Sequence, residues 1–215
     1  MTALNLDETA DMLDAVARAY RHRLRRFGTE PSGVYWRDRE GQCRRFQILA
    51  GIFAGDGASG RLSVNDLGCG YGALFEYLAG LPVVRDGTYF GYNLCAEMIE
   101  AATARIDDLR ATFIHSLLAT HEADYSFASG AYNLNGDAED GPWTVYVKAS
   151  LAQLWTKSRK GLAFNMLDRA KPGRQRGLFY ADSREYVDFC ARNLSPNVSL
   201  IDNDPLPDWT ILVRR

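Results

Sequence analysis

No stretch of the 215-residue sequence approaches the roughly 18 to 20 consecutive apolar residues that a membrane-spanning helix requires. Residues 1–11 are polar and acidic, so the chain also lacks the charged start and apolar stretch of a secretory leader. We therefore expect a cytoplasmic protein with no membrane partner. A formal net charge of −2 likewise argues against a protein whose whole surface binds nucleic acid, although a local basic patch stays open.

Cysteines are few, and no two of them form a C-x-x-C pair. The four residues Cys43, Cys69, Cys95 and Cys190 lie far apart in the sequence, which argues against a disulfide framework and against a zinc site. A single domain of this length buries roughly 70% of the surface that its unfolded chain exposes, so its core is stable without disulfides or a structural metal. We expect no bound metal and interpret the thiols as small buried side chains.

Hydrophobic periodicity divides the chain into two parts. In residues 1–60, apolar residues recur at steps of three and four, which predicts helices over about 12–24 and 39–53 before a glycine-rich run at 55–60. From residue 61 onward, short apolar runs alternate with helical segments, as in a parallel α/β sheet. The predicted strands are 62–67, 87–92, 110–115, 123–129, 160–167, 197–202 and 208–214, and the predicted helices are 73–80, 95–108, 142–157 and 183–193.

Two local signals near the C-terminus are specific. Asp182 can cap the helix over 183–193, and Glu185 stands three residues further on, as in a capping box. Only residues 203–207 separate the last two strands, which is too short for a crossover helix. These strands should therefore form an antiparallel hairpin.

The glycine-rich stretch 64–72, which reads VNDLGCGYG, is the strongest feature. It predicts a strand that ends in a sharp turn and leads into a helix, with a backbone that can approach a nucleotide or nucleoside closely. Gly68, Gly70 and Ala73 also satisfy the dinucleotide pattern G-x-G-x-x-G/A. The glycines alone therefore do not choose between these cofactors.

Asp66 narrows the choice, because a carboxylate two residues before the first glycine repels a pyrophosphate and attracts a cation. S-adenosylmethionine carries both a sulfonium and an ammonium group. With this stretch, the sequence resembles the class I S-adenosylmethionine-dependent methyltransferases, whose first motif is similar to residues 66–72, and the resemblance covers about 61–215. It implies a Rossmann-like, doubly wound, seven-stranded α/β sheet, mostly parallel with an antiparallel C-terminal hairpin, to which residues 1–60 add an N-terminal helical cap.

The resemblance also implies which residues bind the cofactor. Asp66 would lie near the amino-acid end, Leu94 on the adenine and Ser116 at the adenine amino group. Asn93 stands where the family has an acidic residue that binds the ribose hydroxyls. The amide can still bind them, but the loss of the charge-assisted hydrogen bond weakens the contact by on the order of 1 kcal/mol. The full implied set is Asp66, Gly68, Cys69, Gly70, Gly72, Asn93, Leu94, Ser116, Ser129 and Gly130, with Arg45.

Arg45 and other basic residues each have two interpretations. Residues 33–36, with Gln42, Arg44 and Arg45, precede the sheet and as a cap would close over the methionine end of the cofactor. Arg45 could pair with the carboxylate of the cofactor, or it could be a surface arginine of its helix. The loop 168–177 carries four positive charges against one negative, which suits either a lid over an anionic substrate or a solvated loop. The first helix carries five arginines that could hold RNA phosphates or form a solvated face: Arg18, Arg21, Arg23, Arg25 and Arg26.

The sequence does not identify a catalytic residue. Methyl transfer is an in-line displacement in which positioning supplies much of the rate, and a base is needed only if the acceptor atom carries a proton. Tyr132, Asn133 and Tyr180 are candidates by their positions near strand ends, with core packing or cofactor contact as the alternative for each.

The predicted function is thus a methyltransferase that uses S-adenosylmethionine and acts on a small-molecule acceptor. Four alternatives stay open: a cofactor-binding protein without catalysis, non-methyl chemistry on the same cofactor, an RNA methyltransferase, and an NAD-dependent oxidoreductase. The near-zero net charge favours a small acceptor over a nucleic acid. The acceptor atom and the oligomeric state are open.

Overall fold

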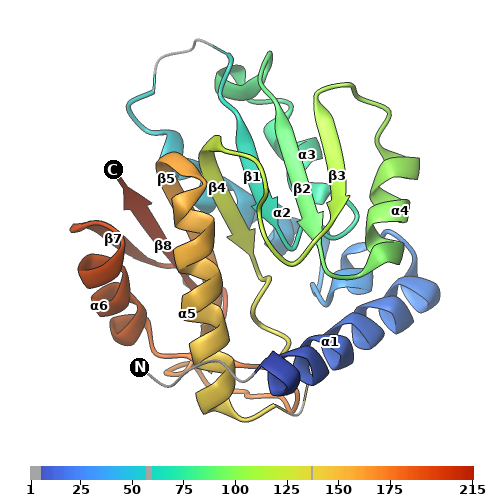
Figure 1. Ribbon diagram of the computed structural model, residues 1–215, viewed down its shortest axis with the longest axis vertical. Helices are drawn as coiled ribbons and strands as arrows, with labels where there is room; N and C mark the ends of the chain where they lie inside the picture. The colour runs from blue at the N-terminus through green and yellow to red at the C-terminus, as the bar shows by residue number, and fades with distance from the viewer. Residues whose placement is uncertain (1–5, 57–59, 137) are drawn as a thin grey trace.

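The computed structural model describes residues 6–56, 60–136 and 138–215. Figure 1 shows one twisted sheet with helices on both of its faces. No helix in these ranges is long and apolar enough to span a membrane. The predicted glycine-rich boundary at 55–60 lies in part outside the described residues, because 57–59 are not among them.

The sheet has the predicted topology, with one additional short strand. Its strands are β1 (Val64–Leu67), β2 (Tyr89–Asn93), β3 (Ala111–His115), β4 (Ala123–Ser129), β5 (Ser158–Asp168), β6 (Tyr180–Ala181), β7 (Asn197–Asp202) and β8 (Asp208–Arg214). They are ordered β3-β2-β1-β4-β5-β8-β7, and β8 runs antiparallel to both of its neighbours. The mostly parallel sheet and the C-terminal hairpin are confirmed. The count of seven strands is corrected to eight, because the two-residue β6 pairs with β5 beside this path.

The predicted helices are present, and their ends are shifted except in the last of them. They are α1 (Leu6–Phe27), α2 (Arg39–Ala50), α3 (Ala73–Leu78), α4 (Ala96–Arg105), α5 (Asp140–Thr156) and α6 (Ser183–Asn193). The described residues also form the 3-10 turns η1 (Pro31–Val34) and η3 (Pro82–Val84), where no helix was predicted, and η2 (Gly51–Phe53). The helix predicted over 39–53 is α at first and ends as the 3-10 turn η2. Asp182 does cap α6, because its carboxylate accepts a hydrogen bond from the Arg184 N–H over 2.9 Å. Glu185 does not complete a capping box and instead accepts from Lys148.

Two hydrophobic cores lie on opposite faces of the sheet. Residues of α1, α5 and α6 pack on one face, with Trp143, Trp209 and Tyr186 among the largest buried side chains. Residues of α2, η2 and α3 pack on the other, around Phe46 and Phe127. Three of the four cysteines are buried and all four are free thiols.

The predicted N-terminal cap is therefore made of two different pieces. Figure 1 shows α1 crossing the edge of the sheet where β1, β2 and β4 end. In contrast, α2 and η2 share the second core with β1 and β4 and form a regular layer of the domain. The edge where parallel strands of such a sheet bind ligands is thus covered by α1 and residues 31–36, with Gln42 and Phe46 of α2 beside them.

Candidate cofactor site and adjoining cavity

The turn after β1 depends on glycine at positions 68 and 70. The Gly68 and Cys69 N–H groups both donate to the Tyr92 carbonyl, at 2.8 and 3.0 Å, which bends the chain sharply at the end of the strand. Gly68 and Gly70 have φ values of +80° and +56°, a region that side-chain-bearing residues rarely adopt. A Cβ atom on Gly68 would also lie 2.6 Å from the Cβ atom of Ala131. The backbones that follow β1 and β4 therefore come into direct contact.

Gly72 is required for a different reason. Its φ is +86°, and a Cβ atom there would lie 2.3 Å from Ile106 Cδ1 and 3.1 Å from Phe113. These are side chains between α4 and β3, not groups of the pocket described below. The third glycine of the motif thus allows close packing at the start of α3.

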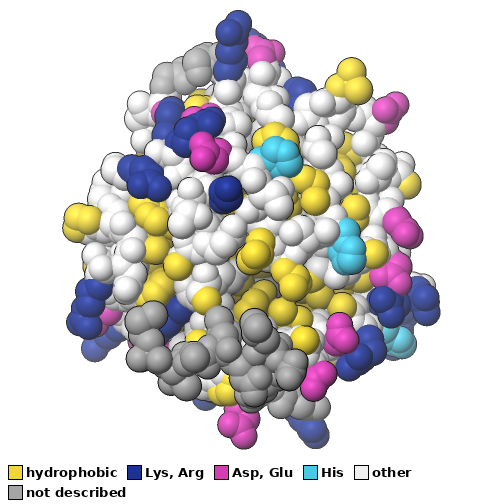
Figure 2. All heavy atoms as spheres, in the orientation of Figure 1, with side chains coloured by type: hydrophobic (Ala, Val, Ile, Leu, Met, Phe, Trp, Pro, Cys, Tyr) yellow, Lys and Arg dark blue, Asp and Glu magenta, His cyan; other side chains and the backbone are white. Residues whose placement is uncertain are grey.

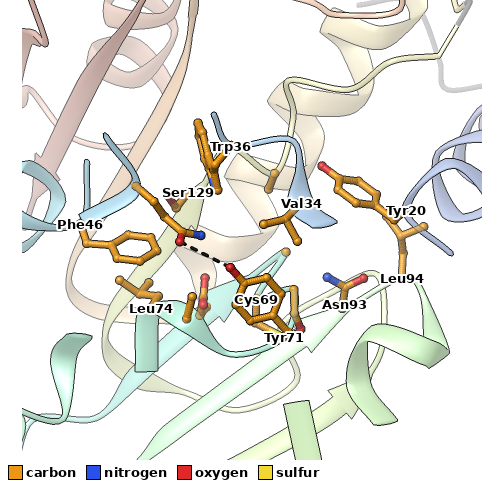
Figure 3. Close-up of a pocket in the computed structure, with 17 residues that line it drawn as sticks. Tyr20, Val34, Trp36, Phe46, Cys69, Tyr71, Leu74, Asn93, Leu94 and Ser129 are labelled. Atoms are coloured by element: carbon orange, nitrogen blue, oxygen red, sulfur yellow. Dashed lines mark hydrogen bonds between the residues drawn. The ribbon is translucent and has the colours of Figure 1, made fainter. Parts of the chain in front are cut away.

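A pocket lies over this turn, and we call it the cofactor pocket. Its floor consists of the β1–α3 turn and the ends of β2 and β4, and its roof consists of α1, residues 34–36 and α2. Figure 3 shows Val34, Trp36 and Tyr20 on the roof side, opposite Tyr71 and Asn93. The enclosed volume is about 50 Å³, which is room for a few water molecules.

Asp66 is the acidic group of this pocket. It is 2% exposed, and its Oδ2 accepts a hydrogen bond from the Tyr89 hydroxyl. Burial raises the pKa of the Asp66 carboxyl to about 7, although the hydrogen bond from Tyr89 acts in the opposite direction. A cation in the pocket would favour the ionised carboxylate.

Asn93 and Leu94 border the pocket from the end of β2. The Asn93 Oδ1 accepts a hydrogen bond from the Cys95 N–H over 2.9 Å, so this side-chain oxygen binds the backbone at the start of α4. The side-chain amide nitrogen is the group that remains for a ligand. An Asp or Glu at this position could only accept hydrogen bonds, whereas Asn93 has N–H groups to donate.

Ser116 and His115 follow from β3, and both lie outside the lining of the cofactor pocket. The Ser116 hydroxyl donates to the Leu118 carbonyl over 2.8 Å and accepts from the Leu118 N–H. A ring nitrogen of His115 lies 3.0 Å from the Leu94 carbonyl. These two side chains therefore stabilise loops beside the pocket.

The end of β4 brings Ser129 and Gly130 to the pocket. The Ser129 Oγ is buried and has no hydrogen-bond partner among the described residues. The Gly130 N–H donates to Asn165 Oδ1 over 2.7 Å. Trp36 packs directly on Gly130, since a Cβ atom there would lie 2.6 Å from the indole ring. This glycine thus lets the roof approach the floor.

Arg45 has a structural partner. Its side chain is 7% exposed and forms an ion pair with the fully buried Asp208 of β8, and Trp36 lies over its guanidinium at 4.4 Å. The alternative of a solvated surface arginine is wrong, because the side chain is buried. Arg45 does not line the cofactor pocket but borders a second cavity next to it.

This second cavity, which we call the outer cavity, has a volume of about 520 Å³. It is bordered by residues of 34–45, the loop 172–180 and the hairpin turn 205–207, and it shares Tyr20, Val34, Trp36 and Gly130 with the cofactor pocket. Of the three shared side chains, Val34 and Trp36 belong to the segment 33–36 that the sequence placed in a cap over the methionine end of the cofactor. Tyr20 stood only in a helical pattern, so no local signal marked it.

The three catalytic candidates lie in different places. Tyr132 belongs to the first core, where its hydroxyl lies 2.9 Å from Ser150 Oγ, so the alternative of core packing holds for it and not the catalytic one. Asn133 and Tyr180 both border the outer cavity. Each also supports the backbone there: Asn133 Oδ1 accepts from the Leu167 N–H, and the Tyr180 hydroxyl accepts from the Gln175 N–H.

Several charges of the predicted basic segments are already neutralised. In the loop 168–177, Lys171 contacts both Asp202 and Asp204 at 3.1 Å, and Arg169 lies 3.6 Å from Asp140. In α1, Arg21 pairs with Glu97. These pairings weaken the interpretations of the loop as an anion-binding lid and of α1 as an RNA-binding face.

Comparison with known proteins identifies the family. No family model matches the chain. The chain is 38% identical over 161 residues, 74% of its own length, to the Mycobacterium tuberculosis protein named "Putative methyltransferase Rv1506c", and it covers 96% of that protein. Its fold is similar to that of magnesium protoporphyrin IX methyltransferase from Synechocystis with bound S-adenosylmethionine, at a TM-score of 0.65 and 14% identity, over the whole of both chains. It is also similar to human N-acetylserotonin methyltransferase, at a TM-score of 0.55 and 17% identity, over 97% of this chain and 66% of that one.

The fold and the relative together define the class of protein. The chain belongs to the class I S-adenosylmethionine-dependent methyltransferases, and S-adenosylmethionine is its cofactor. The residues of the pocket fit this group, because a glycine turn, a buried carboxyl and an unpartnered Ser129 Oγ meet there. The volume of about 50 Å³ is smaller than a nucleoside with an amino-acid tail, so we expect the roof to move outward when the cofactor binds.

Proposed function

We propose that the methyl acceptor is a small molecule that binds in the outer cavity. The observation that carries this proposal is the shared wall: a cavity of about 520 Å³ adjoins the cofactor pocket at Tyr20, Trp36 and Gly130. Sites for small organic molecules in proteins have volumes of about 300 to 1,000 Å³. An acceptor in this cavity would lie next to the end of β4, where the cofactor's methionine part is expected.

The lining of the outer cavity supports an acceptor that is largely apolar and carries few charges. Aromatic and aliphatic side chains, including Tyr35, Trp36, Leu134 and Leu178, form much of it, and charged residues of both signs also border it: Arg37, Asp38, Glu40 and Arg44. The buried Arg45 is neutralised by Asp208. Two of the similar structures are named as methyltransferases of magnesium protoporphyrin IX and of N-acetylserotonin, both small molecules. A macromolecular acceptor would have to enter between α1 and the loop 172–180.

We assign the following roles to the chain's own residues. The cofactor supplies a methyl group on a positively charged sulfur. Asp66 attracts the ammonium group, and the Asn93 amide donates to a ribose hydroxyl. Val34 and Trp36 keep water away from the reacting atoms, and positioning of the acceptor supplies much of the rate. No residue of the pocket is needed as a base if the acceptor atom carries no proton.

The test is a methyl-transfer assay with labelled S-adenosylmethionine and cell extract separated into small-molecule, RNA, DNA and protein fractions. We expect label in the small-molecule fraction. Leu178→Trp, which places an indole in the outer cavity, should abolish that labelling. Leu109→Trp is the matched control, because Leu109 is fully exposed. Labelling of RNA, DNA or protein that survives Leu178→Trp would contradict the proposal.

A further inference from the structure

We propose that Gln42 and Tyr71 bind the carboxylate at the methionine end of the cofactor, the role that the sequence suggested for Arg45. This inference rests on S-adenosylmethionine as the cofactor and assigns a specific contact to two side chains. Both side chains line the cofactor pocket. Gln42 comes from α2, and Tyr71 comes from the glycine turn between Gly70 and Gly72.

The first observation is the environment of Gln42. Its side chain is 5% exposed, in a helix whose neighbouring Gln47 is exposed. Its only hydrogen bond among the described residues is a long one, in which the Tyr71 hydroxyl donates to Oε1 over 3.5 Å. The amide N–H groups therefore have no protein partner. The amide nitrogen is not among the fully buried side-chain atoms without a partner, so it faces accessible space and can donate to a ligand that accepts hydrogen bonds.

The second observation is the position of the Tyr71 hydroxyl. Tyr71 is 3% exposed, and Figure 3 shows its hydroxyl pointing across the pocket to Gln42. Burial raises the pKa of this hydroxyl above its ordinary value, so it is a hydrogen-bond donor at neutral pH. A small rotation would turn the O–H from the Gln42 carbonyl to a bound anion. Two donors from different elements thus meet at one place beside Gly70.

The third observation is the charge of the pocket. No Lys, Arg or His side chain is among the described residues that line it, so neutral donors must hold any anion there. Asp66 is its acidic group and attracts the ammonium, so the carboxylate must be held by N–H and O–H groups such as those of Gln42 and Tyr71.

The experiment compares two ligands by calorimetry. S-adenosylhomocysteine carries the amino-acid end, whereas 5′-methylthioadenosine has the same adenosine and sulfur without it. Because hydrogen bonds to a charged group are the strong ones, Gln42→Leu should weaken S-adenosylhomocysteine binding roughly 10- to 100-fold. The same variant should leave 5′-methylthioadenosine binding unchanged. Gln47→Leu, on an exposed position of the same helix, is the control and should change neither affinity.

A second variant keeps the shape of the side chain. Gln42→Glu places one carboxylate against another, so it should weaken S-adenosylhomocysteine more than Gln42→Leu does and still spare 5′-methylthioadenosine. Equal losses for both ligands would show that Gln42 only shapes the pocket, and unchanged affinities would also overturn the proposal. Failure of the unmodified protein to bind S-adenosylhomocysteine would instead contradict the cofactor, which separates the two questions.

Discussion

The floor and the roof of the cofactor pocket are built in different ways. The floor is backbone: Gly68, Gly70 and Gly130 allow turns that no other residue type would fit. The roof consists of side chains from α1, residues 34–36 and α2, and contacts distant in sequence hold it, such as the ion pair of Arg45 with Asp208. The comparison teaches that changes in the floor should act mainly on cofactor affinity, whereas changes in the roof should act on stability or on one part of a ligand.

Arg45 gives the sharpest separation of stability from binding. Arg45→Met leaves the buried Asp208 without its cation, which should lower the free energy of unfolding by about 3 to 5 kcal/mol. The affinity for S-adenosylhomocysteine should stay unchanged, because Arg45 does not line the cofactor pocket. Denaturant unfolding and calorimetry measure the two quantities. Arg37→Met is the control, since that side chain is 97% exposed. A loss of S-adenosylhomocysteine affinity in Arg45→Met, and not in Arg37→Met, would restore the interpretation that Arg45 binds the carboxylate of the cofactor.

Gly68 tests the floor. In Gly68→Ala the new Cβ atom meets Ala131 at a positive φ, so the ends of β1 and β4 must move apart. Strain of roughly 1 to 3 kcal/mol at such a position should weaken S-adenosylhomocysteine by as much as about 100-fold. Gly141→Ala is the matched control, because a Cβ atom there has nothing within 4 Å. Unaltered affinity in Gly68→Ala would mean that the floor adapts as readily as the roof.

Asp66 should make cofactor binding pH-dependent. The pKa of its carboxyl is about 7 in the free protein, and the cofactor's ammonium prefers the ionised carboxylate. The affinity for the cofactor should therefore rise with pH through 7. One pH unit below the pKa it should be about tenfold weaker than at a pH well above the pKa. Folding has the opposite dependence: because the folded pKa lies above the ordinary 3.8, the contribution of this carboxyl to stability falls as pH rises from about 4 to 7. Calorimetry between pH 5.5 and 8 measures the first effect. Asp66→Asn should remove it, and an equally steep profile in that variant would assign the dependence to another group.

The elements that the sequence predicted well are those with local signals. The residues of the glycine turn stand next to one another in the chain, and the hairpin follows from the short link between β7 and β8. In contrast, β6 has two residues, which is too short for a periodic pattern. Tyr132 shows a related limit, because it follows β4 closely and yet points into the core.

The roof could not be predicted in the same way. The ion pair of Arg45 with Asp208 joins residues 163 positions apart, and no local pattern distinguishes Arg45 from the neighbouring, exposed Arg44. Gln42 was expected near the methionine end of the cofactor as part of the cap, but its burial was not predicted. A polar residue in a helix is normally assigned to the solvent side, and only the packing of α2 on the sheet shows that Gln42 is buried.

The side chains shared by the two cavities have a consequence for binding. Tyr20, Val34 and Trp36 border both the cofactor pocket and the outer cavity, so an outward movement of the roof that admits the cofactor also reshapes the adjoining space. The two ligands are then linked by a coupling free energy, and thermodynamic reciprocity requires that each change the affinity of the other by the same factor. A ligand that fills the outer cavity should therefore be recognisable by its effect on cofactor affinity, even before any methyl group is transferred.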